Sequence, residues 1–365
     1  MINGHGGNIY GLAKELGCKT SDIIDMSSNV NPLGPPPGLI TFLKKNFDSI
    51  TSLPEVDSNE AVCAFSKYYN ISKERILAGN GTTQFIYSVP KAIGSKRALI
   101  LGPTYSDYED GCIMHDVGYE YLFSDESSSF FPDLEKLKKR IKYFDTVFIC
   151  NPNNPTGTLI PKNYLESLFV SYPDKFFIID ESYMPFVKGN NNESLLRSGF
   201  ENVLVLNSMS KIFGIPGLRI GFLIASKENI GRFLPYYLPW SVNSIAQAAV
   251  CYLMDPKNGA DSFIGKTVNY LENERIRLIK RFKDIPEIKL FPSTTSFILC
   301  KLDKNLSAEK VCPLLSLDKI LIRNCSNFKG LSDNYVRISL KTYDLNSLIY
   351  KKLSNIITPE GAGIR

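Results

Sequence analysis

The sequence predicts an α/β fold in which a mostly parallel, seven-stranded sheet is joined to a smaller α+β domain. Short β-branched or aromatic runs alternate with helical patterns from about residue 75 to 225, and this pattern changes after about residue 260. Helices cover both faces of a parallel sheet, so its strands are continuous apolar runs. The length of 365 residues also exceeds what one hydrophobic core usually serves.

Seven apolar runs are predicted to form the larger sheet. They are RILA (75–78), RALIL (97–101), YEYLF (119–123), TVFIC (146–150), FFIID (176–180), VLVLN (203–207) and IGFLI (220–224). Between two of them, the helical segment DLEKLKKRIKYF places Leu134, Leu137, Ile141 and Phe144 on one face. We expect residues 46–258 to form the large domain.

The rest of the chain is predicted to form the smaller domain. A long charged helix (263–282) precedes the strands TSFILCKL (295–302), ILIR (320–323) and YVRISL (335–340) and a last helix near 345–356. The first 45 residues are rich in Gly, Pro and Asn and are expected to pack on this domain as an arm. Residues 1–45 and 259–365 would therefore belong together.

Composition excludes several classes of function. The 42 basic and 37 acidic residues are mixed along the chain, which predicts no nucleic-acid partner. No run of about 18 apolar residues could span a membrane, and the N-terminus has no secretory pattern, so we expect a cytoplasmic protein. Two histidines provide little material for a metal site, and the eight cysteines lack a C-x-x-C pair, which indicates reduced core residues.

The segment NSMSKIFGIPGLRIGF (207–222) contains the first candidate for chemistry. Lys211 lies among Ser208, Ser210 and Arg219. A lysine amine can form a Schiff base with an aldehyde, while hydroxyl and guanidinium groups bind a phosphate. The cofactor that combines an aldehyde with a phosphate is pyridoxal 5'-phosphate (PLP).

Three further segments suit the same cofactor. Asp180 ends the run FFIID, at the carboxyl end of a predicted parallel strand, where α/β folds bind ligands. PLP needs an acid there to keep its pyridine nitrogen protonated. Asn154 in NPNNPTG can donate to the ring hydroxyl oxygen. The segment GNGTT (79–83) precedes an apolar helix whose first amides can bind phosphate.

The ordered set GNGTT, PTY, NPNNPTG, D-E-x-Y and S-x-S-K with P-G-L-R-x-G resembles the fold-type I PLP enzymes of the aminotransferase class I and II family, over nearly the whole chain. The resemblance implies a catalytic set in which Lys211 binds PLP and moves the proton at Cα, Asp180 pairs with the pyridine nitrogen and Tyr105 stacks on the ring. The PLP-binding residues that it implies are Gly81, Thr82, Thr83, Tyr105, Asn154, Asp180, Tyr183, Ser208, Ser210, Lys211 and Arg219.

The resemblance also implies how a substrate is bound. Arg337 in YVRISL matches the family's C-terminal arginine, which binds the α-carboxylate together with Asn154. The segments GHGGNIYGLAKELG, IIDMSSNVNPLGPPPGL and ILIRNCSNFKGL resemble the threonine-phosphate decarboxylases of cobalamin biosynthesis. A small phosphorylated amino acid is therefore the expected substrate. His5, Asn31 and Arg323 are the candidates for binding its phosphate.

Several choices stay open at this point. O-phospho-L-threonine and O-phospho-L-serine differ by one methyl group, worth only about 1–3 kcal/mol in a pocket. An aminotransferase acting on histidinol phosphate is the alternative reaction. The family's sites lie at a subunit interface, which implies a homodimer. However, Leu53 replaces the tyrosine that reaches the partner's cofactor phosphate, and it cannot donate that hydrogen bond.

Overall fold

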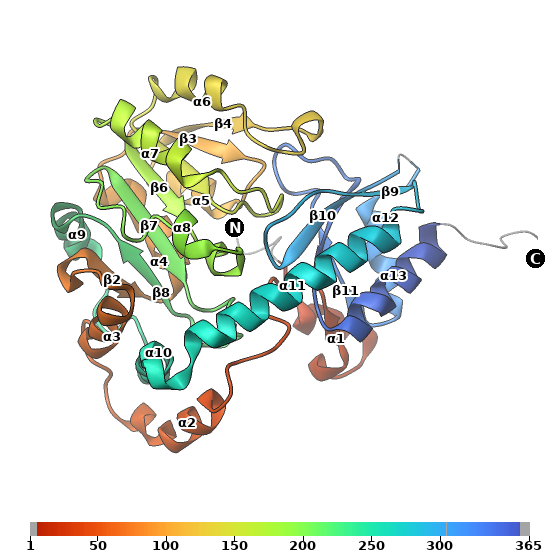
Figure 1. Ribbon diagram of the computed structural model, residues 1–365, viewed down its shortest axis with the longest axis horizontal. Coiled ribbons are helices and arrows are strands. Elements are labelled where there is room, and N and C mark those ends of the chain that lie inside the picture. Colours follow the sequence, from red (N-terminus) through yellow and green to blue (C-terminus); the bar gives the residue numbers. More distant parts are fainter. Residues whose placement is uncertain (1–5, 304, 358–365) are drawn as a thin grey trace, which may run out of the picture.

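The computed structural model describes residues 6–303 and 305–357, and its centre is a seven-stranded sheet of order β2-β8-β7-β6-β5-β3-β4 (Figure 1). The strands are β2 (Ile76–Gly79), β3 (Arg97–Gly102), β4 (Gly118–Phe123), β5 (Thr146–Cys150), β6 (Phe176–Asp180), β7 (Val203–Ser208) and β8 (Gly221–Ile224). Strands β4, β3, β5, β6 and β7 run parallel, whereas β8 pairs antiparallel with β2 and β7. The predicted mostly parallel sheet is confirmed.

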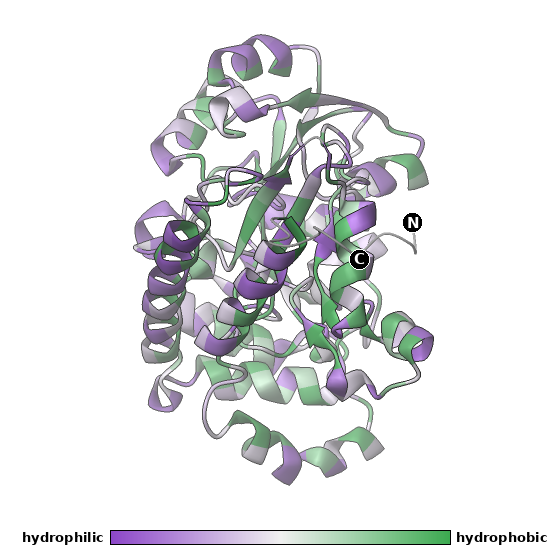
Figure 2. Ribbon diagram, turned by 90° about the vertical axis from the view of Figure 1, so that its right-hand side faces the viewer, coloured by the Kyte–Doolittle hydropathy of each residue, from purple (hydrophilic) through white to green (hydrophobic). Residues whose placement is uncertain are grey.

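Helices cover both faces of this sheet because successive side chains of each strand point to opposite faces. One face packs on α4 (Gly81–Ala92), α5 (Asp107–Met114) and α9 (Lys227–Phe233). The other packs on α3 (Asn59–Tyr69), α6 (Leu134–Ile141), α7 (Lys162–Ser171) and α10 (Ser244–Met254). Figure 2 shows the hydrophobic strands at the centre and hydrophilic outer faces on the helices. In α6 the predicted face is confirmed, since Leu137 and Ile141 are fully buried.

A second sheet is antiparallel and has the order β12-β13-β10-β9. Its strands are β9 (Ile288–Leu290), β10 (Phe297–Leu302), β12 (Arg323–Asn324) and β13 (Tyr335–Ser339), and its helices are α11 (Ala260–Phe282), α12 (Ala308–Leu317) and α13 (Tyr343–Ile357). Helix α11 runs diagonally from beside α10 to the smaller sheet (Figure 1). The predicted strand ILIR is divided: β11 (Ile320–Leu321) pairs with β1 (Ile24–Asp25), and β12 pairs with β13.

The N-terminal segment packs in two places. Helix α1 (Ile9–Leu16) and β1 lie against the smaller sheet, where the backbone of Met26 accepts a hydrogen bond of 2.9 Å from Ser339. Helix α2 (Leu39–Lys45) instead packs on α10 of the large sheet, with the rings of Phe42 and Tyr252 4.8 Å apart. The expected arm on the smaller domain therefore describes only the first part of this segment.

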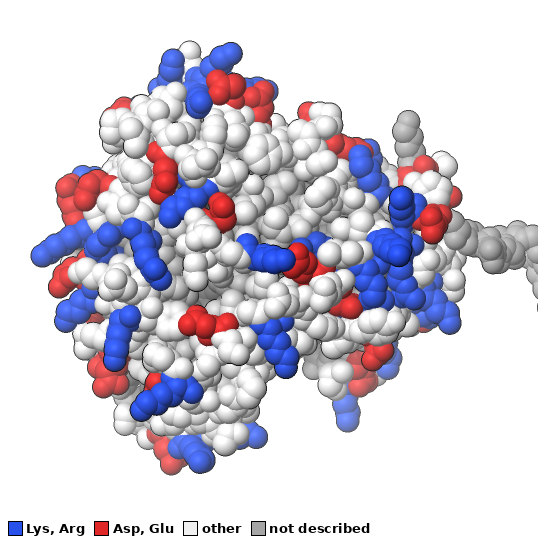
Figure 3. Space-filling view, in the orientation of Figure 1, with Lys and Arg blue, Asp and Glu red and all other residues white. Residues whose placement is uncertain are grey.

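The predictions about nucleic-acid and membrane partners concern surface charge and long apolar helices. Figure 3 shows basic and acidic side chains interspersed over the visible face. Within residues 6–303 and 305–357, no helix has the length and apolarity needed to cross a bilayer.

All eight cysteines are free, and Cys112, Cys150, Cys300 and Cys325 are buried. Cys63 is exposed, so it differs from the expected core position.

Candidate active site

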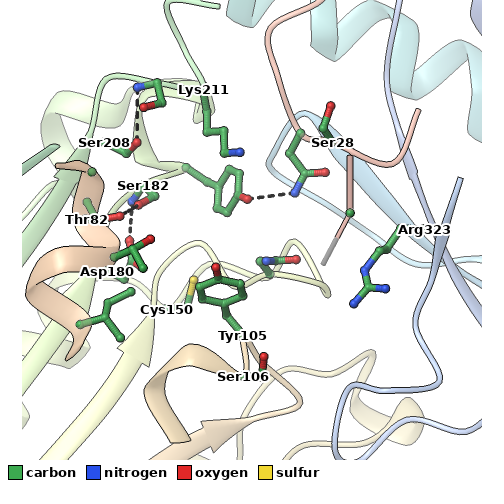
Figure 4. A pocket seen from close by; sticks show the side chains of 18 of the residues that line it. Ser28, Thr82, Tyr105, Ser106, Cys150, Asp180, Ser182, Ser208, Lys211 and Arg323 are labelled. Carbon is green, nitrogen blue, oxygen red and sulfur yellow. Dashed lines mark hydrogen bonds between the residues drawn. The ribbon is translucent and has the colours of Figure 1, made fainter. Parts of the chain in front are cut away.

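A polar pocket of about 220 Å³ lies where the two sheets meet (Figure 4). The parallel strands β5, β6 and β7 end at its floor, which is the position where open α/β sheets bind ligands. The structure brings thirteen predicted residues together here. They are Gly81, Thr82, Thr83, Tyr105, Asn154, Asp180, Tyr183, Ser208, Ser210, Lys211, Arg219, Arg323 and Arg337.

Asp180 forms the floor at the end of β6. Its Oδ1 accepts a hydrogen bond of 2.9 Å from the backbone of Ser182, and its Oδ2 accepts one of 2.8 Å from the hydroxyl of Tyr108. Burial raises the pKa of Asp180, although these hydrogen bonds act in the opposite direction. A cation placed beside this carboxylate would offset the cost of burying its charge. The floor therefore suits a protonated ring nitrogen.

The start of helix α4 forms a cradle for an anion. Asn80, at the N-cap, makes no side-chain hydrogen bond to the first amides of α4 in the described part of the chain. These amides need a partner, and anions bind at such helix starts. Gly81 has a φ of +74°, and a Cβ on it would lie 2.6 Å from Nη2 of Arg219. The glycine thus lets the guanidinium of Arg219 approach the helix start.

Lys211 enters the pocket from the turn that follows β7. Figure 4 shows its side chain pointing into the cavity between the labelled Ser208 and Ser28. Burial lowers the pKa of its amine to about 8, and the nearby guanidinium groups of Arg337 and Arg219 contribute. A lowered pKa leaves more of the amine neutral near pH 8, and the neutral amine is the nucleophile.

Next to Lys211, two tyrosines border the space that a ring would occupy. Tyr183 is buried, and its hydroxyl oxygen accepts a hydrogen bond of 3.0 Å from Nδ2 of Asn29. Burial raises the pKa of Tyr183 to about 12, so its hydroxyl stays protonated at neutral pH. The ring of Tyr105 packs edge-on to that of Tyr108, with centroids 6.0 Å apart. Tyr105 and Asp180 thus belong to one aromatic and acidic floor.

Arg337 is buried on β13 and is held from two sides. Its Nη1 donates to Oδ1 of Asn154, and its Nη2 donates to the backbone oxygen of Ser27 at 2.6 Å. Its Nε makes no hydrogen bond within the described residues. The guanidinium is therefore oriented before any ligand binds.

Arg323 provides a second cationic wall. It lies on β12, and Figure 4 shows it entering from the side opposite Thr82 and Asp180. Its Nη2 donates to Oδ1 of Asn327 at 2.7 Å, and its guanidinium lies 5.1 Å from the ring centroid of Phe328. Burial lowers the pKa of Arg323 to about 10, so the side chain is still a cation at neutral pH.

The structure contradicts the predicted substrate role of Asn31. Its Nδ2 donates to the backbone oxygen of Ile212 at 2.7 Å and to Oγ1 of Thr267 at 2.9 Å, and its Oδ1 accepts from the backbone of Leu33. The side-chain amide is therefore used inside the fold, and Asn31 is not among the residues that line the pocket. His5 lies outside the described residues.

Several residues that line the pocket were missed from the sequence. They are Gly6, Ser27, Ser28, Asn29, Ile86, Ser106, Tyr108, Cys150, Ser182, Asn327 and Phe328. Within the polar run MSSNVN, Asn31 was the predicted site residue, but Asn29, two positions earlier, is the asparagine that reaches the pocket. Alternation along an extended segment would have favoured both asparagines equally.

The comparison with known families agrees with this geometry. The model of the family described as aminotransferase class I and II matches residues 21–348. The chain belongs to this family. It accordingly has the fold-type I architecture and uses PLP as its cofactor.

Two relatives in the family and one solved structure are similar over most of this chain. The adenosylcobalamin biosynthesis bifunctional protein CobDQ of Leptospira interrogans is 33% identical over 96% of this chain, which spans only 41% of that protein. The threonine-phosphate decarboxylase of Salmonella typhimurium is 28% identical over 97% of this chain and 96% of that enzyme's length. The histidinol-phosphate aminotransferase of Clostridium acetobutylicum superposes with a TM-score of 0.84 at 28% identity, covering 92% of this chain and all of that one.

The pocket fits the family's cofactor. The helix start beside Gly81 and Arg219 could hold the phosphate, and Asp180 could pair with the ring nitrogen. Lys211 lies at the opposite side of the same cavity from Asp180 in Figure 4, which suits a covalent bond to the aldehyde carbon. Anion cradle, acid and amine thus match the three functional groups of PLP.

Proposed function

We propose that this chain decarboxylates a small phosphorylated amino acid, either O-phospho-L-threonine or O-phospho-L-serine. The bond between Cα and the carboxylate carbon breaks, carbon dioxide leaves, and a proton is added at Cα. The products would be (R)-1-aminopropan-2-yl phosphate or ethanolamine phosphate, and the use would be the linker of the cobalamin nucleotide loop. The names of the two relatives support this proposal.

The observation that carries the proposal is the pair of arginines in the pocket. Arg337 is oriented for an α-carboxylate, and Arg323 provides a separate cation on the wall away from the cofactor cradle. A substrate that carries both a carboxylate and a phosphate would satisfy both guanidinium groups. An amino acid with an apolar side chain would leave Arg323 without an anion.

Each group of pocket residues has a separate proposed role. When bound, PLP supplies a ring that accepts the electron pair of the bond broken at Cα. Asp180 would keep the ring nitrogen protonated, Tyr105 would stack on the ring, and Asn154 and Tyr183 would bond its phenolic oxygen. The start of α4, with Ser208, Ser210 and Arg219, would hold the phosphate. Lys211 then holds or returns the proton at Cα.

The choice between decarboxylation and transamination depends on orientation. With PLP bound, the angle at which the pocket holds the substrate would decide whether the bond from Cα to the carboxylate or the bond from Cα to hydrogen breaks. Arg323 would use the phosphate, remote from the reacting carbon, to set this angle. The alternative is a histidinol-phosphate aminotransferase, which is the activity named for the similar Clostridium structure.

We further propose that the active form is a cytoplasmic homodimer whose subunits each comprise a large domain (46–258) and a smaller unit (1–45 and 259–365). Exposed apolar side chains support a dimer: Leu53 is 78% exposed, Leu238 64% and Trp240 51%. The two segments that carry them are adjacent, since the backbone of Trp240 donates to that of Val56 at 3.0 Å. A second copy would bury this apolar face.

The deciding experiment incubates the PLP-loaded enzyme separately with the two phosphorylated amino acids. Carbon dioxide and the amine product should appear with at least one of them, and the ratio of kcat/KM values names the preferred substrate. The Lys211→Ala enzyme provides the background and should release no carbon dioxide. Conversion of the cofactor to its amine form without carbon dioxide would instead identify an aminotransferase.

A further inference from the structure

The wall of the pocket that carries Arg323 continues into a short segment that reaches back to the large sheet. We define this strap as residues Cys325–Leu331, the first part of the connection from β12 to β13. Two tight turns shape it: the amide of Phe328 donates to the oxygen of Cys325, and that of Leu331 donates to the oxygen of Phe328, both at 3.0 Å. Asn327 and Phe328 of the strap line the pocket.

The strap is joined to the large sheet's side of the pocket through Lys329. Its Nζ lies 2.6 Å from Oε1 of Glu109 on α5. The same carboxylate accepts hydrogen bonds from the hydroxyls of Tyr119 (2.8 Å) and Tyr121 (2.9 Å) on β4. The nitrogen of Lys329 also lies 5.5 Å and 5.7 Å from the centroids of these two rings. Four groups therefore form one charged and aromatic anchor.

This anchor differs from an ordinary surface ion pair. Exposed pairs contribute little because water solvates both charges and the side chains lose freedom. Here the side chain of Lys329 is 52% exposed, but that of Glu109 is only 13% exposed and three donors surround it. The next residue, Gly330, has a φ of +90°, and a Cβ on it would lie 2.5 Å from Cδ1 of Phe123. The backbone of the strap thus lies directly on the aromatic end of β4.

The strap in turn supports Arg323. Asn327 accepts a hydrogen bond of 2.7 Å from its Nη2, and the ring of Phe328 lies against its guanidinium. A continuous chain of contacts therefore runs from Glu109 through Lys329 and its neighbours to the phosphate-binding arginine. Helix α5 begins directly after Tyr105 and Ser106, which line the pocket, so the anchor and the cofactor floor belong to one rigid element.

We propose that Glu109 is a positioning residue which, through Lys329, holds the strap and with it Arg323 in place for the phosphate of the substrate. This inference rests on the function proposed above. It assigns phosphate selectivity to a carboxylate outside the pocket, although a carboxylate by itself would repel a phosphate. The role of Glu109 is to fix Lys329 and thereby the strap, which contacts Arg323 through the uncharged amide of Asn327 and the ring of Phe328.

A separate anchor makes the test feasible. Glu126 accepts contacts from Lys289 of β9, Lys301 of β10 and the hydroxyl of Tyr335 of β13. These contacts hold the smaller sheet against the loop after β4 without involving the strap. Changing Glu109 or Lys329 therefore leaves the two sheets connected, and the expected effect is confined to the strap and Arg323.

The experiment compares Glu109→Gln and Lys329→Met with two matched controls in the PLP-loaded enzyme. Glu120→Gln removes a carboxylate of β4 that pairs with Arg97 and Arg140, away from the strap. Lys329→Arg retains the cation. We expect Glu109→Gln and Lys329→Met each to raise KM for O-phospho-L-threonine about tenfold, the order of one lost charge-assisted contact, with kcat changed less than about threefold. Both controls should behave like wild type.

Two further readouts separate positioning from general stability. The double variant should lose no more than either single variant, because both changes break one contact. Hydrogen exchange at the amides of Phe328 and Leu331 should be faster in Glu109→Gln than in Glu120→Gln without substrate. Unchanged exchange would overturn the anchor, and faster exchange with an unchanged KM would overturn its role in phosphate binding. If wild type itself turned over no phosphorylated amino acid, the proposed function would fail, while the exchange rates would still decide whether Glu109 holds the strap.

Discussion

Arg323 and Arg337 are register partners on the antiparallel strands β12 and β13, and both side chains line the pocket that contains Lys211. Like charges directly opposite each other destabilise a sheet. Burial adds to this cost, as the lowered pKa of Arg323 indicates. The Arg323–Arg337 pair therefore does not stabilise the fold. Its presence instead favours a ligand with two anionic groups, one for each guanidinium.

The first prediction concerns Arg323. Replacing Arg323 with Gln should lower kcat/KM for the phosphorylated substrate roughly 10- to 100-fold, because a charge-assisted hydrogen bond contributes roughly 1.5–3 kcal/mol and every 1.4 kcal/mol is a factor of ten. Binding of the unphosphorylated amino acid, followed by the absorbance of the bound cofactor, should change little. Equal losses for both ligands would contradict a phosphate role.

A matched control for this prediction is Arg97→Gln. Arg97 lies on β3, its side chain is 52% exposed and it pairs with Glu120. The substitution removes one positive charge from the protein without touching the pocket. It should leave the preference for the phosphorylated over the unphosphorylated ligand unchanged. This result would separate a local contact of Arg323 from the effect of net charge.

The second prediction concerns the amine of Lys211. Its folded-state pKa of about 8 lies below the ordinary value of 10.5, because burial and two guanidinium groups disfavour the cation. Only the neutral amine attacks an aldehyde, so PLP uptake by the apoenzyme should accelerate as the pH rises to 8 and level off above it. Stopped-flow absorbance between pH 6 and 10 measures this profile, with Lys211→Ala giving the background. A rate that still rises above pH 10 would contradict it.

The Arg337→Gln enzyme provides the comparison for this profile. Arg337 is the first charged contributor to the lowered pKa of Lys211. Without that cation, protonated Lys211 is less disfavoured, and the midpoint should move to higher pH. An unchanged midpoint would mean that Arg337 does not contribute to the lowered pKa of Lys211.

The sequence predicts those features of the structure that depend on local patterns of residues. Strand β6 and residue Asp180 at its end were predictable, because a buried parallel strand is a continuous apolar run and its carboxyl end is polar. The position of Lys211 followed from the same logic at the end of β7. In these cases local pattern and tertiary environment agree.

The contacts of the N-terminal segment were not predictable in this way. The bond between the Ser27 backbone and Arg337 joins residues 310 positions apart, and no periodicity encodes it. Asn29 and Asn31 look equivalent in the run MSSNVN, yet one bonds Tyr183 and the other is used inside the fold. The division of ILIR between two sheets likewise depends on β1, which lies far away in the sequence.

The last prediction concerns Glu181, which is fully buried behind the floor of the pocket. Its carboxylate accepts hydrogen bonds of 2.6 Å from Ser194 Oγ and from the backbone of Leu195, yet burial raises its pKa from 4.5 to about 7. The folded protein therefore binds a proton more tightly than the unfolded chain, so this group lowers stability as the pH rises from about 4.5 to 7. Glu181→Gln retains an acceptor without the charge. It should raise the free energy of unfolding relative to wild type at pH 8, by at most about 3 kcal/mol, and the gain should vanish near pH 4.5. Denaturant unfolding of the holoenzyme at both pH values tests this, with the exposed Glu309→Gln as the control; a difference that does not depend on pH would refute it.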